Sequence, residues 1–312
     1  MGTRARPPIT ALMIAPDLES TGNSTLRGLV YAIRPWQWYK QLILYLAVIF
    51  SGSAGELDAW IQTTFGAILF SAVAGATYIL NDVQDREEDR QHPRKQHRPI
   101  ASGQVTPTVA ILCAIVLYVS AGVLSWRLDR LFFGLIVLYV SQNFLYSFGA
   151  KDFLFVDLFS ISAGFVIRAV AGVVLVSVAL SPWLILCVFL TALMLGVSKR
   201  WGEKQDVDNP TDVRSTLSEY SPQTLQFLLG SITTMLLMAY TLYTFFVQDL
   251  AMMLTIPFAF YAVFRFVHLT FINKGASEPV SLILDRGLLV NSLLWGVITI
   301  LILYHDQLGV SV

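Results

Sequence analysis

The residues best suited to chemistry lie together at positions 81–103, in a polar island of an otherwise apolar chain. The island carries five carboxylates, five Lys/Arg residues and two histidines. Its acids come mostly first and most of its bases follow, so carboxylates able to hold Mg²⁺ adjoin cations able to hold phosphate oxygens. The segment therefore predicts chemistry on a diphosphate.

The acids have the spacing of a metal site. If the preceding helix continues into the island, Asn81, Asp85 and Asp89 stack on one face, with Asp82 beside them. That arrangement offers oxygen ligands to Mg²⁺ ions that keep their waters and bridge phosphate oxygens. The alternative is a solvated helix end with ordinary ion pairs, such as Asp82 with Arg86. The repeated acids directly after an apolar span favour the metal site.

Two prolines shape the basic half of the island. Pro93 and Pro99 break the helix and hold the loop in fixed turns, so that Lys95 and Arg98 can reach back over the acids. Basic loops on a membrane face often only set topology or meet anionic lipid. Because these bases adjoin the acids, we predict that they bind phosphate.

The elements that must position these residues are membrane-spanning helices. The 312 residues are 55% hydrophobic and only 13% charged, with a mean hydropathy of +0.63, whereas soluble domains carry about 25% charged residues. Apolar runs recur at about the 18–25 residues that cross a bilayer as a helix, which predicts an all-α membrane protein with about nine spans. The expected spans are 39–51, 59–80, 107–126, 131–148, 153–176, 182–197, 225–247, 250–270 and 282–304.

Charge asymmetry predicts the orientation. With the N-terminus in the cytoplasm, the external side keeps only Arg127 and Arg130 among the Lys/Arg residues. We therefore expect an integral protein of the cell (inner) membrane whose polar island faces the cytoplasm. Residues 1–24 are expected to form a loose tail, and residues 25–312 a single polytopic transmembrane catalytic domain.

Residues outside the island could extend the site. Arg168 lies near the middle of the 153–176 span, where an arginine is costly. It either serves function or forms an interhelical ion pair or carbonyl cap, and Asp157 lies about three turns earlier on the same face. Tyr146 and Lys151 flank the turn before this span. Lys151 is the better candidate to bind an anionic phosphate, while Tyr146 could hydrogen-bond or act as an interface aromatic.

The island resembles the first Asp-rich motif of the UbiA superfamily of intramembrane prenyltransferases, and the expected spans match that fold. The matching residues are Asn81-Asp82-x-x-Asp85-x-x-x-Asp89, His92-Pro93 and Arg98-Pro99-Ile100-Ala101-Ser102-Gly103. Within the superfamily the chain most resembles the decaprenyl-phosphate phosphoribosyltransferases, from Leu26 to the last helix. That branch is resembled by Arg34-Pro35-x-Gln37-Trp38-x-Lys40, Tyr146-Ser147-x-Gly149-x-Lys151, Phe165-x-x-Arg168-Ala169-x-Ala171-Gly172 and Lys199-Arg200-x-x-Glu203 with Arg214-x-x-Leu217-x-x-Tyr220, although Gln41 stands where Asn is usual.

The second polar loop bears on the choice of donor. Typical members of the superfamily carry a second Asp-rich motif there, whereas this chain has Glu203 with the bases Lys199 and Arg200. A phosphoribosyl diphosphate brings an extra 5-phosphate, which these bases and Arg214 could bind. The alternative is a positive cluster that caps the C-terminus of a helix. A displaced second acidic motif also stays open, with Asp206, Asp208 and Asp212.

The resemblance implies Mg²⁺-dependent transfer of a 5-phosphoribosyl group from phosphoribosyl diphosphate to a polyprenyl (decaprenyl) phosphate, for cell-envelope arabinan synthesis. Asp82, Asp85, Asp89 and Lys151 would be catalytic, and Asn81 with the three aspartates would hold the metal. The substrate-binding residues would be Lys40, Lys95, Arg98, Tyr146, Arg168, Lys199, Arg200 and Glu203. The lipid bilayer is an expected partner and nucleic acid is not, while a homo-oligomer stays open.

Two other functions are weighed against this one. A prenyl diphosphate could be the donor, with an aromatic or other small molecule as acceptor. A membrane transporter or lipid-binding protein is a different class, but transporters place polar groups near the midplane, often at broken helices. In this chain the polar residues concentrate on one face, with only Arg168 deep in a span, which favours an interfacial enzyme.

Overall fold

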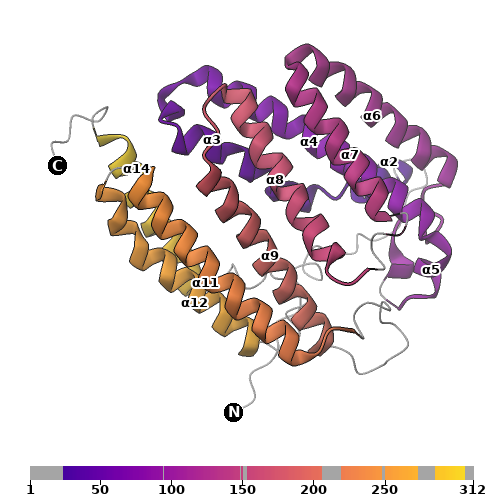
Figure 1. Cartoon of the computed structure of the whole chain (residues 1–312). Helices are drawn as coiled ribbons and strands as arrows, with labels where there is room; N and C mark the ends of the chain where they lie inside the picture. The colour runs from indigo at the N-terminus through magenta and orange to yellow at the C-terminus, as the bar shows by residue number, and fades with distance from the viewer. Residues whose placement is uncertain are drawn as a thin grey trace.

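The computed structural model describes residues 24–93, 95–147, 149, 153–205, 219–247, 250–272 and 285–305, and every regular element in these ranges is a helix. The long helices lie side by side in a bundle (Figure 1), which confirms the expected all-α class. The elements are α2 (Ser24–Ile33), η1 (Pro35–Leu44), α3 (Tyr45–Phe50), η2 (Ser53–Gly55), α4 (Leu57–Gln84), α5 (Arg86–Gln91), η3 (Lys95–His97), α6 (Pro107–Leu128), α7 (Arg130–Ser147), α8 (Val156–Val176), α9 (Pro182–Gln205), α11 (Pro222–Phe246), η6 (Leu250–Thr255), α12 (Ile256–Ile272) and α14 (Arg286–Leu303).

Among the described residues, seven helices are long and apolar enough to cross a membrane: α4, α6, α8, α9, α11, η6 with α12, and α14. Each coincides with one expected span. The expected span 131–148 is the 18-residue helix α7, which does not reach the hydropathy of those seven. The expected span 39–51 is not one continuous helix, because it divides into the 3₁₀ helix η1 and the six-residue helix α3.

The break before that segment has a local cause. Arg34 has a left-handed backbone with φ 57° and directly precedes Pro35. A proline disfavours right-handed helical conformation in the residue before it. Helix α2 therefore ends at Ile33, and the chain starts again as η1.

The turns place the polar residues at one end of the bundle. Helices α4, α7 and α9 end there, and α6, α8 and α11 begin there, because consecutive long helices run antiparallel (Figure 1). We call this the charged end. It unites residues more than a hundred positions apart in sequence, including Asp82 and Arg200.

Close packing holds the helices that carry the site. Phe70 of α4 meets Phe132 and Tyr139 of α7 edge-on, with ring centroids 5.7 and 5.6 Å apart. Such aromatic pairs stabilise a core by about 0.5–1.5 kcal/mol each beyond burial. Gly172 of α8 lies so near η1 that a Cβ atom would come within 2.2 Å of the Leu44 carbonyl oxygen. A glycine is therefore required where these two backbones meet.

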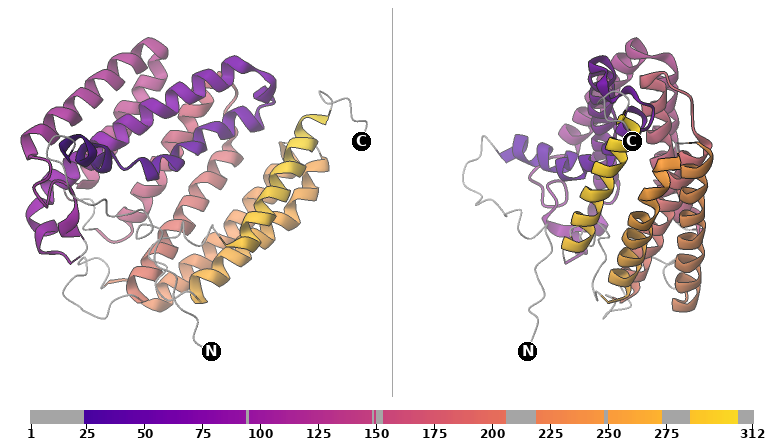
Figure 2. Two further views of the ribbon diagram at one scale, coloured as in Figure 1. Left: turned by 180° about the vertical axis from the view of Figure 1, so that it is seen from behind. Right: turned by 90° about the vertical axis from the view of Figure 1, so that its left-hand side faces the viewer.

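The last helix is tied to the first part of the chain at the opposite end. The Tyr304 hydroxyl accepts a hydrogen bond from the Ala54 N–H at 3.1 Å. It also lies 2.8 Å from the Ile49 carbonyl oxygen, to which it donates. Along its length α14 packs on α12 (Figure 2). Tyr304, at the end of α14, thus joins α3 and η2 away from the charged end.

Candidate active site

Two carboxylates from α4 and α5 meet at one arginine of the loop that follows. Asp82 and Asp89 are buried, with 3% and 2% of their surface exposed. Arg98 Nη1 donates to Asp82 Oδ1 at 3.0 Å and to Asp89 Oδ2 at 2.6 Å. Lys95 Nζ lies 4.0 Å from Asp89 Oδ1. Both bases therefore reach back over the acids, as the flanking prolines predict.

A second arginine reaches the same carboxylate from the N-terminal segment. Arg34 Nη2 donates to Asp82 Oδ1 at 2.6 Å, across 48 positions of sequence. The left-handed backbone at Arg34 fixes its direction, and strained non-glycine residues of this kind concentrate at functional sites. We call Arg34, Asp82, Asp89, Lys95 and Arg98 the first cluster. Sequence reasoning did not place Arg34 in the site, although the Arg-Pro pair was a signal for a fixed turn.

The other two predicted metal ligands lie beside this cluster. A one-residue turn at Asp85 separates α4 from α5, but backbone bonds continue across it, so the helix extends into the island as expected. Asn81 Oδ1 accepts a hydrogen bond from Ser147 of α7 at 3.1 Å. Tyr146 is the neighbour of Ser147, so the end of α7 adjoins the acids. The simple pair of Asp82 with Arg86 is not formed, since Arg86 lies 3.7 Å from Glu87 instead.

The chemistry of these donors fits Mg²⁺, although their present arrangement is an ion-pair network. Carboxylate and amide oxygens are the ligands that Mg²⁺ prefers, and one or two carboxylates suffice when phosphate and water complete the shell. Both bonds to Asp82 fall on Oδ1, which leaves Oδ2 for another partner. Within the described ranges, no three His, Cys, Asp or Glu residues converge as a ready metal site. A metal would therefore have to share Asp82 and Asp89 with Arg98.

A second cluster joins α8, α9 and the start of α11. Arg200 Nε donates to Asp157 Oδ2 at 2.6 Å, and Arg200 Nη1 donates to Glu203. The Tyr220 hydroxyl donates to Asp157 Oδ1 at 3.0 Å and accepts the Phe155 N–H at 3.0 Å. We call Asp157, Arg200, Glu203 and Tyr220 the second cluster. Arg200 and Asp157 are 4% and 1% exposed, so this is a buried interhelical ion pair.

The phenol of the second cluster stays protonated. Burial and the neighbouring Asp157 carboxylate both raise the pKa of Tyr220 above its ordinary value. The hydroxyl therefore acts as a donor to the carboxylate at every physiological pH. Tyr220 was recognised only as part of a sequence motif, because nothing in its spacing predicts a partner 63 positions away.

Asp157 and Arg168, which the sequence places on one face of α8, have separate partners. Asp157 pairs with Arg200, while Arg168 donates to Gln41, Tyr139 and the Gly164 carbonyl. For Arg168 this matches the carbonyl cap that the sequence left as an alternative, and Arg168 forms no ion pair within the described residues. Lys199 Nζ lies 3.8 Å from Glu203 Oε1 on the more exposed side of α9.

Part of the predicted site lies outside the described residues. These positions are Arg94, Lys151, Asp206, Asp208, Asp212 and Arg214. The proposed catalytic role of Lys151 and the displaced acidic motif therefore stay predictions.

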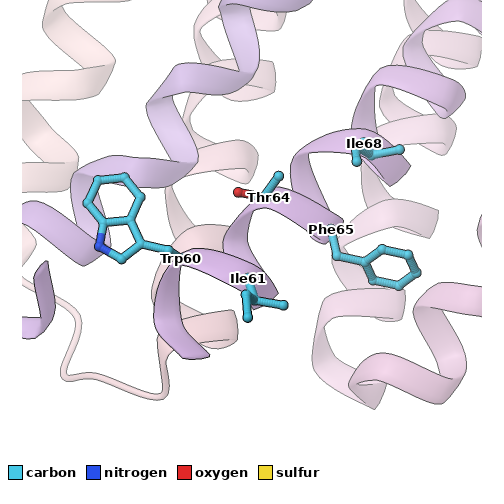
Figure 3. A pocket seen from close by; sticks show the side chains of 5 residues that line it. All are labelled: Trp60, Ile61, Thr64, Phe65 and Ile68. Carbon is cyan, nitrogen blue, oxygen red and sulfur yellow. The ribbon is translucent and has the colours of Figure 1, made fainter. Parts of the chain in front are cut away.

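A hollow elsewhere on α4 has no such chemistry. Trp60, Ile61, Thr64, Phe65 and Ile68 line an open depression of about 350 Å³ (Figure 3). It lies roughly 20–30 Å along the helix from Asp82, by the rise of about 1.5 Å per residue. Its lining carries no ionisable group, so the charged end is the better candidate for the reaction.

The fold and the charged end define a membrane-embedded transferase, and the chain belongs to the UbiA prenyltransferase family, which matches residues 42–298. It is 31% identical over 228 residues to decaprenyl-phosphate phosphoribosyltransferase of Mycolicibacterium smegmatis, covering 72% of each chain. It is 28% identical to the protein of that name in Corynebacterium glutamicum, covering 89% of this chain and 87% of the relative. A UbiA homolog from Archaeoglobus fulgidus bound to GPP and Mg²⁺ has the same fold, with a TM-score of 0.65 and 15% identity over 94% of this chain and 100% of the other.

Proposed function

We propose that the chain transfers a 5-phosphoribosyl group from phosphoribosyl diphosphate to a polyprenyl phosphate, at the cytoplasmic face of the cell membrane. The name of the relatives given above supports the transferred group and the polyprenyl phosphate acceptor. The product, a polyprenyl-phosphoryl-5-phosphoribose, would serve the synthesis of cell-envelope arabinan.

The observation that carries the proposal is the composition of the second cluster. Its carboxylates, Asp157 and Glu203, are both held by Arg200, so they form an ion-pair network in place of a second Asp-rich motif. Among the described residues, a prenyl diphosphate would lack the second set of acids that cages it through metal ions. A donor with an additional phosphate instead calls for additional cations, and Lys199 lies on the exposed side of this cluster.

Asp82, Asp85 and Asp89, with Asn81, would hold Mg²⁺, which would neutralise charge on the departing diphosphate. Arg98 is central to this arrangement because it contacts both Asp82 and Asp89. Because the metal and Arg98 compete for the same two carboxylates, donor binding would free N–H groups of Arg98 for phosphate oxygens. Its side chain is 27% exposed, which gives it access to a ligand.

Other residues would bind and orient the substrates. Lys95 and Lys151 would contact phosphate oxygens, and Tyr146 would donate a hydrogen bond at the same charged end of the bundle. We propose that Arg200 and Glu203 act by holding α9 against α8. An acceptor phosphate is already an anion near neutral pH, so the transfer needs positioning and charge neutralisation and no strong general base.

Membranes that contain the protein should transfer the labelled ribose of phosphoribosyl diphosphate to a lipid when a polyprenyl phosphate and Mg²⁺ are supplied. Parallel reactions would supply labelled geranyl diphosphate with an aromatic acceptor. Incorporation from the prenyl donor alone would contradict the proposal. Lipid binding without turnover of either donor would instead point to a transporter or lipid-binding protein.

A further inference from the structure

Two cations lie together deeper in the bundle than the two clusters. Arg168, in the middle of α8, is 4% exposed. Its Nε donates to Gln41 Oε1 at 2.8 Å, Nη1 to the Gly164 carbonyl oxygen at 2.7 Å, and Nη2 to the Tyr139 hydroxyl at 2.8 Å. Lys40 precedes Gln41 on η1, and Lys40 Nζ donates to Gln37 Oε1 at 2.8 Å. Every one of these acceptors is neutral.

The charge of this pair is not balanced by the described part of the chain. Neither Lys40 nor Arg168 forms a salt bridge there, and the nearby Arg34 is already engaged by Asp82. Burying a cation is costly unless an anion or several hydrogen bonds compensate it. The hydrogen bonds use one N–H on each nitrogen of Arg168, which leaves a second N–H on Nη1 and on Nη2.

Aromatic rings supply part of the missing compensation. The Arg168 guanidinium carbon lies 4.5 Å from the Tyr139 ring centroid and 5.6 Å from that of Phe165. Lys40 Nζ lies 5.9 Å from the Tyr78 ring, and the Arg34 guanidinium 4.9 Å from the same ring. Ring faces attract cations, but they carry no net charge. This group of side chains therefore carries a surplus of positive charge.

The pKa of Lys40 reflects this surplus of positive charge. Lys40 lies on η1, outside the helices that can span the membrane. Burial, with the adjacent charges of Arg168 and Arg34, lowers the pKa of Lys40 from 10.5 to about 8. The groups that face it are Tyr78 from α4 and Arg168 from α8, with Arg34 just before η1, while α3 carries no carboxylate, lysine, arginine or histidine. An anion placed between Lys40 and Arg168 would relieve this repulsion.

We infer that Lys40 and Arg168 form an anion subsite that receives a phosphate monoester, separate from the diphosphate site at Asp82 and Asp89. The identity of the ligand rests on the proposed function, in which two groups have this chemistry: the lipid phosphate of the acceptor and the 5-phosphate of the donor. Lys40 is half-buried, so a ligand can reach it, whereas Arg168 is buried.

The placement of η1 favours the lipid phosphate. Trp38, Tyr39 and Leu42 are 45%, 42% and 64% exposed on this segment, whereas Gln41 turns inward to Arg168. Exposed Trp and Tyr rings are typical of the membrane interface. The subsite therefore borders a surface from which a lipid could enter. On α4, Tyr78 precedes Asp82 by one helical turn, which places Lys40 on the membrane side of the acids.

Binding to the purified protein in nanodiscs tests the inference without turnover. The probes are farnesyl phosphate, phosphoribosyl diphosphate with Mg²⁺, and farnesol as the uncharged control. Lys40→Gln and Arg168→Gln should each lower the affinity for one phosphate probe about ten- to a hundredfold, which is the effect of losing a hydrogen bond to a charged group. Farnesol binding should not change, and the exposed Arg127→Gln should alter none of the three.

The probe that weakens identifies the source of the phosphate. A loss confined to farnesyl phosphate assigns the subsite to the acceptor, and a loss confined to phosphoribosyl diphosphate assigns it to the donor. Unchanged affinity for both probes in Lys40→Gln would overturn the inference. Because Arg168 is buried, Lys40→Gln with wild-type thermal unfolding is the decisive variant. If phosphoribosyl transfer is absent but phosphate affinity still depends on Lys40, the proposed function is wrong and the subsite is supported.

The pH dependence gives a second readout. Lys40 is charged below its pKa, so phosphate affinity should be full near pH 7 and fall as the pH rises through about 8. Lys40→Arg should keep its affinity over this range, since arginine stays protonated. The same decline in Lys40→Arg as in the wild type would show that the titration belongs to another group and would count against the inference.

Discussion

The two clusters of the charged end share a plan, but they differ in how tightly their arginine is held. In each, one guanidinium joins two carboxylates: Arg98 joins Asp82 to Asp89, and Arg200 joins Asp157 to Glu203. The side chain of Arg98 is 27% exposed and that of Arg200 is 5% exposed. The first arrangement can therefore exchange partners with a ligand, whereas the second joins helices.

The origin of the carboxylates explains this difference. Asp82 and Asp89 lie on one helical segment, and the arginine that joins them comes from a loop. Asp157 and Arg200 lie on different long helices, α8 and α9, so their bond fixes one helix against the other. A non-glycine residue with left-handed backbone adjoins each cluster, Arg34 in the first and Phe155 in the second. Strain of this kind persists where surrounding contacts determine the conformation.

The largest expected effect is on stability, in the second cluster. Arg200→Gln leaves the buried Asp157 without its cation, and breaking a buried pair in this way costs about 3–5 kcal/mol. Thermal or denaturant unfolding in detergent would measure the loss. Arg265→Gln is the matched control, because Arg265 also pairs with an aspartate, Asp285, but at the exposed end of α14. Equal stability of the two variants would remove the structural role of Arg200.

The next effect is on turnover, in the first cluster. Asp89→Asn keeps the shape of the side chain but removes a charge that would hold the metal. We expect transfer to fall about a hundred- to a thousandfold, comparable to the loss of a preorganised electrostatic contact, while unfolding changes little. Initial rates over a range of Mg²⁺ concentrations would measure it. Near-normal activity would remove the metal assignment, and Glu87→Gln serves as a control because Glu87 is exposed in the same helix.

A smaller effect is expected for the arginine of the first cluster. Arg98→Gln should raise the KM for the donor by about tenfold to a hundredfold, since a hydrogen bond to a charged group is lost. The apparent affinity for Mg²⁺ should fall less than the affinity for the donor, because Asp82 and Asp89 then no longer share their oxygens with Arg98. Steady-state kinetics with varied donor would separate the two. A change in kcat with no change in KM would argue against phosphate binding by Arg98.

The smallest effect is expected at the phenol of the second cluster. Tyr220→Phe removes the bond to Asp157 and leaves the Phe155 N–H without its acceptor, at a cost of about 1–3 kcal/mol. Tyr45→Phe is the control, because its hydroxyl bonds Thr64 at an exposed position. Unfolding midpoints of the two variants would be compared. A loss of stability no larger than that of Tyr45→Phe would show that Arg200 alone holds Asp157.

Much of the fold was predictable because a bilayer imposes its own dimensions on the chain. Long apolar runs predicted the seven helices that can span, and their polarity predicted that the polar loops gather at one end. The segment 39–51 was predicted less well. Its composition is that of a span, but the Arg34–Pro35 junction and close contact with Gly172 give it a 3₁₀ start and only a short α-helix.

By itself the sequence determined the membrane class, the family, and the two bases that fold back over the acids at Asp82 and Asp89. These follow from composition and from spacing within one segment. Only the tertiary structure decided the long-range partners: Arg34 with Asp82, Arg200 and Tyr220 with Asp157, and Gln41 and Tyr139 with Arg168. The reason is physical, because a buried charge needs compensation within hydrogen-bond distance, and which side chain supplies it depends on how distant helices pack.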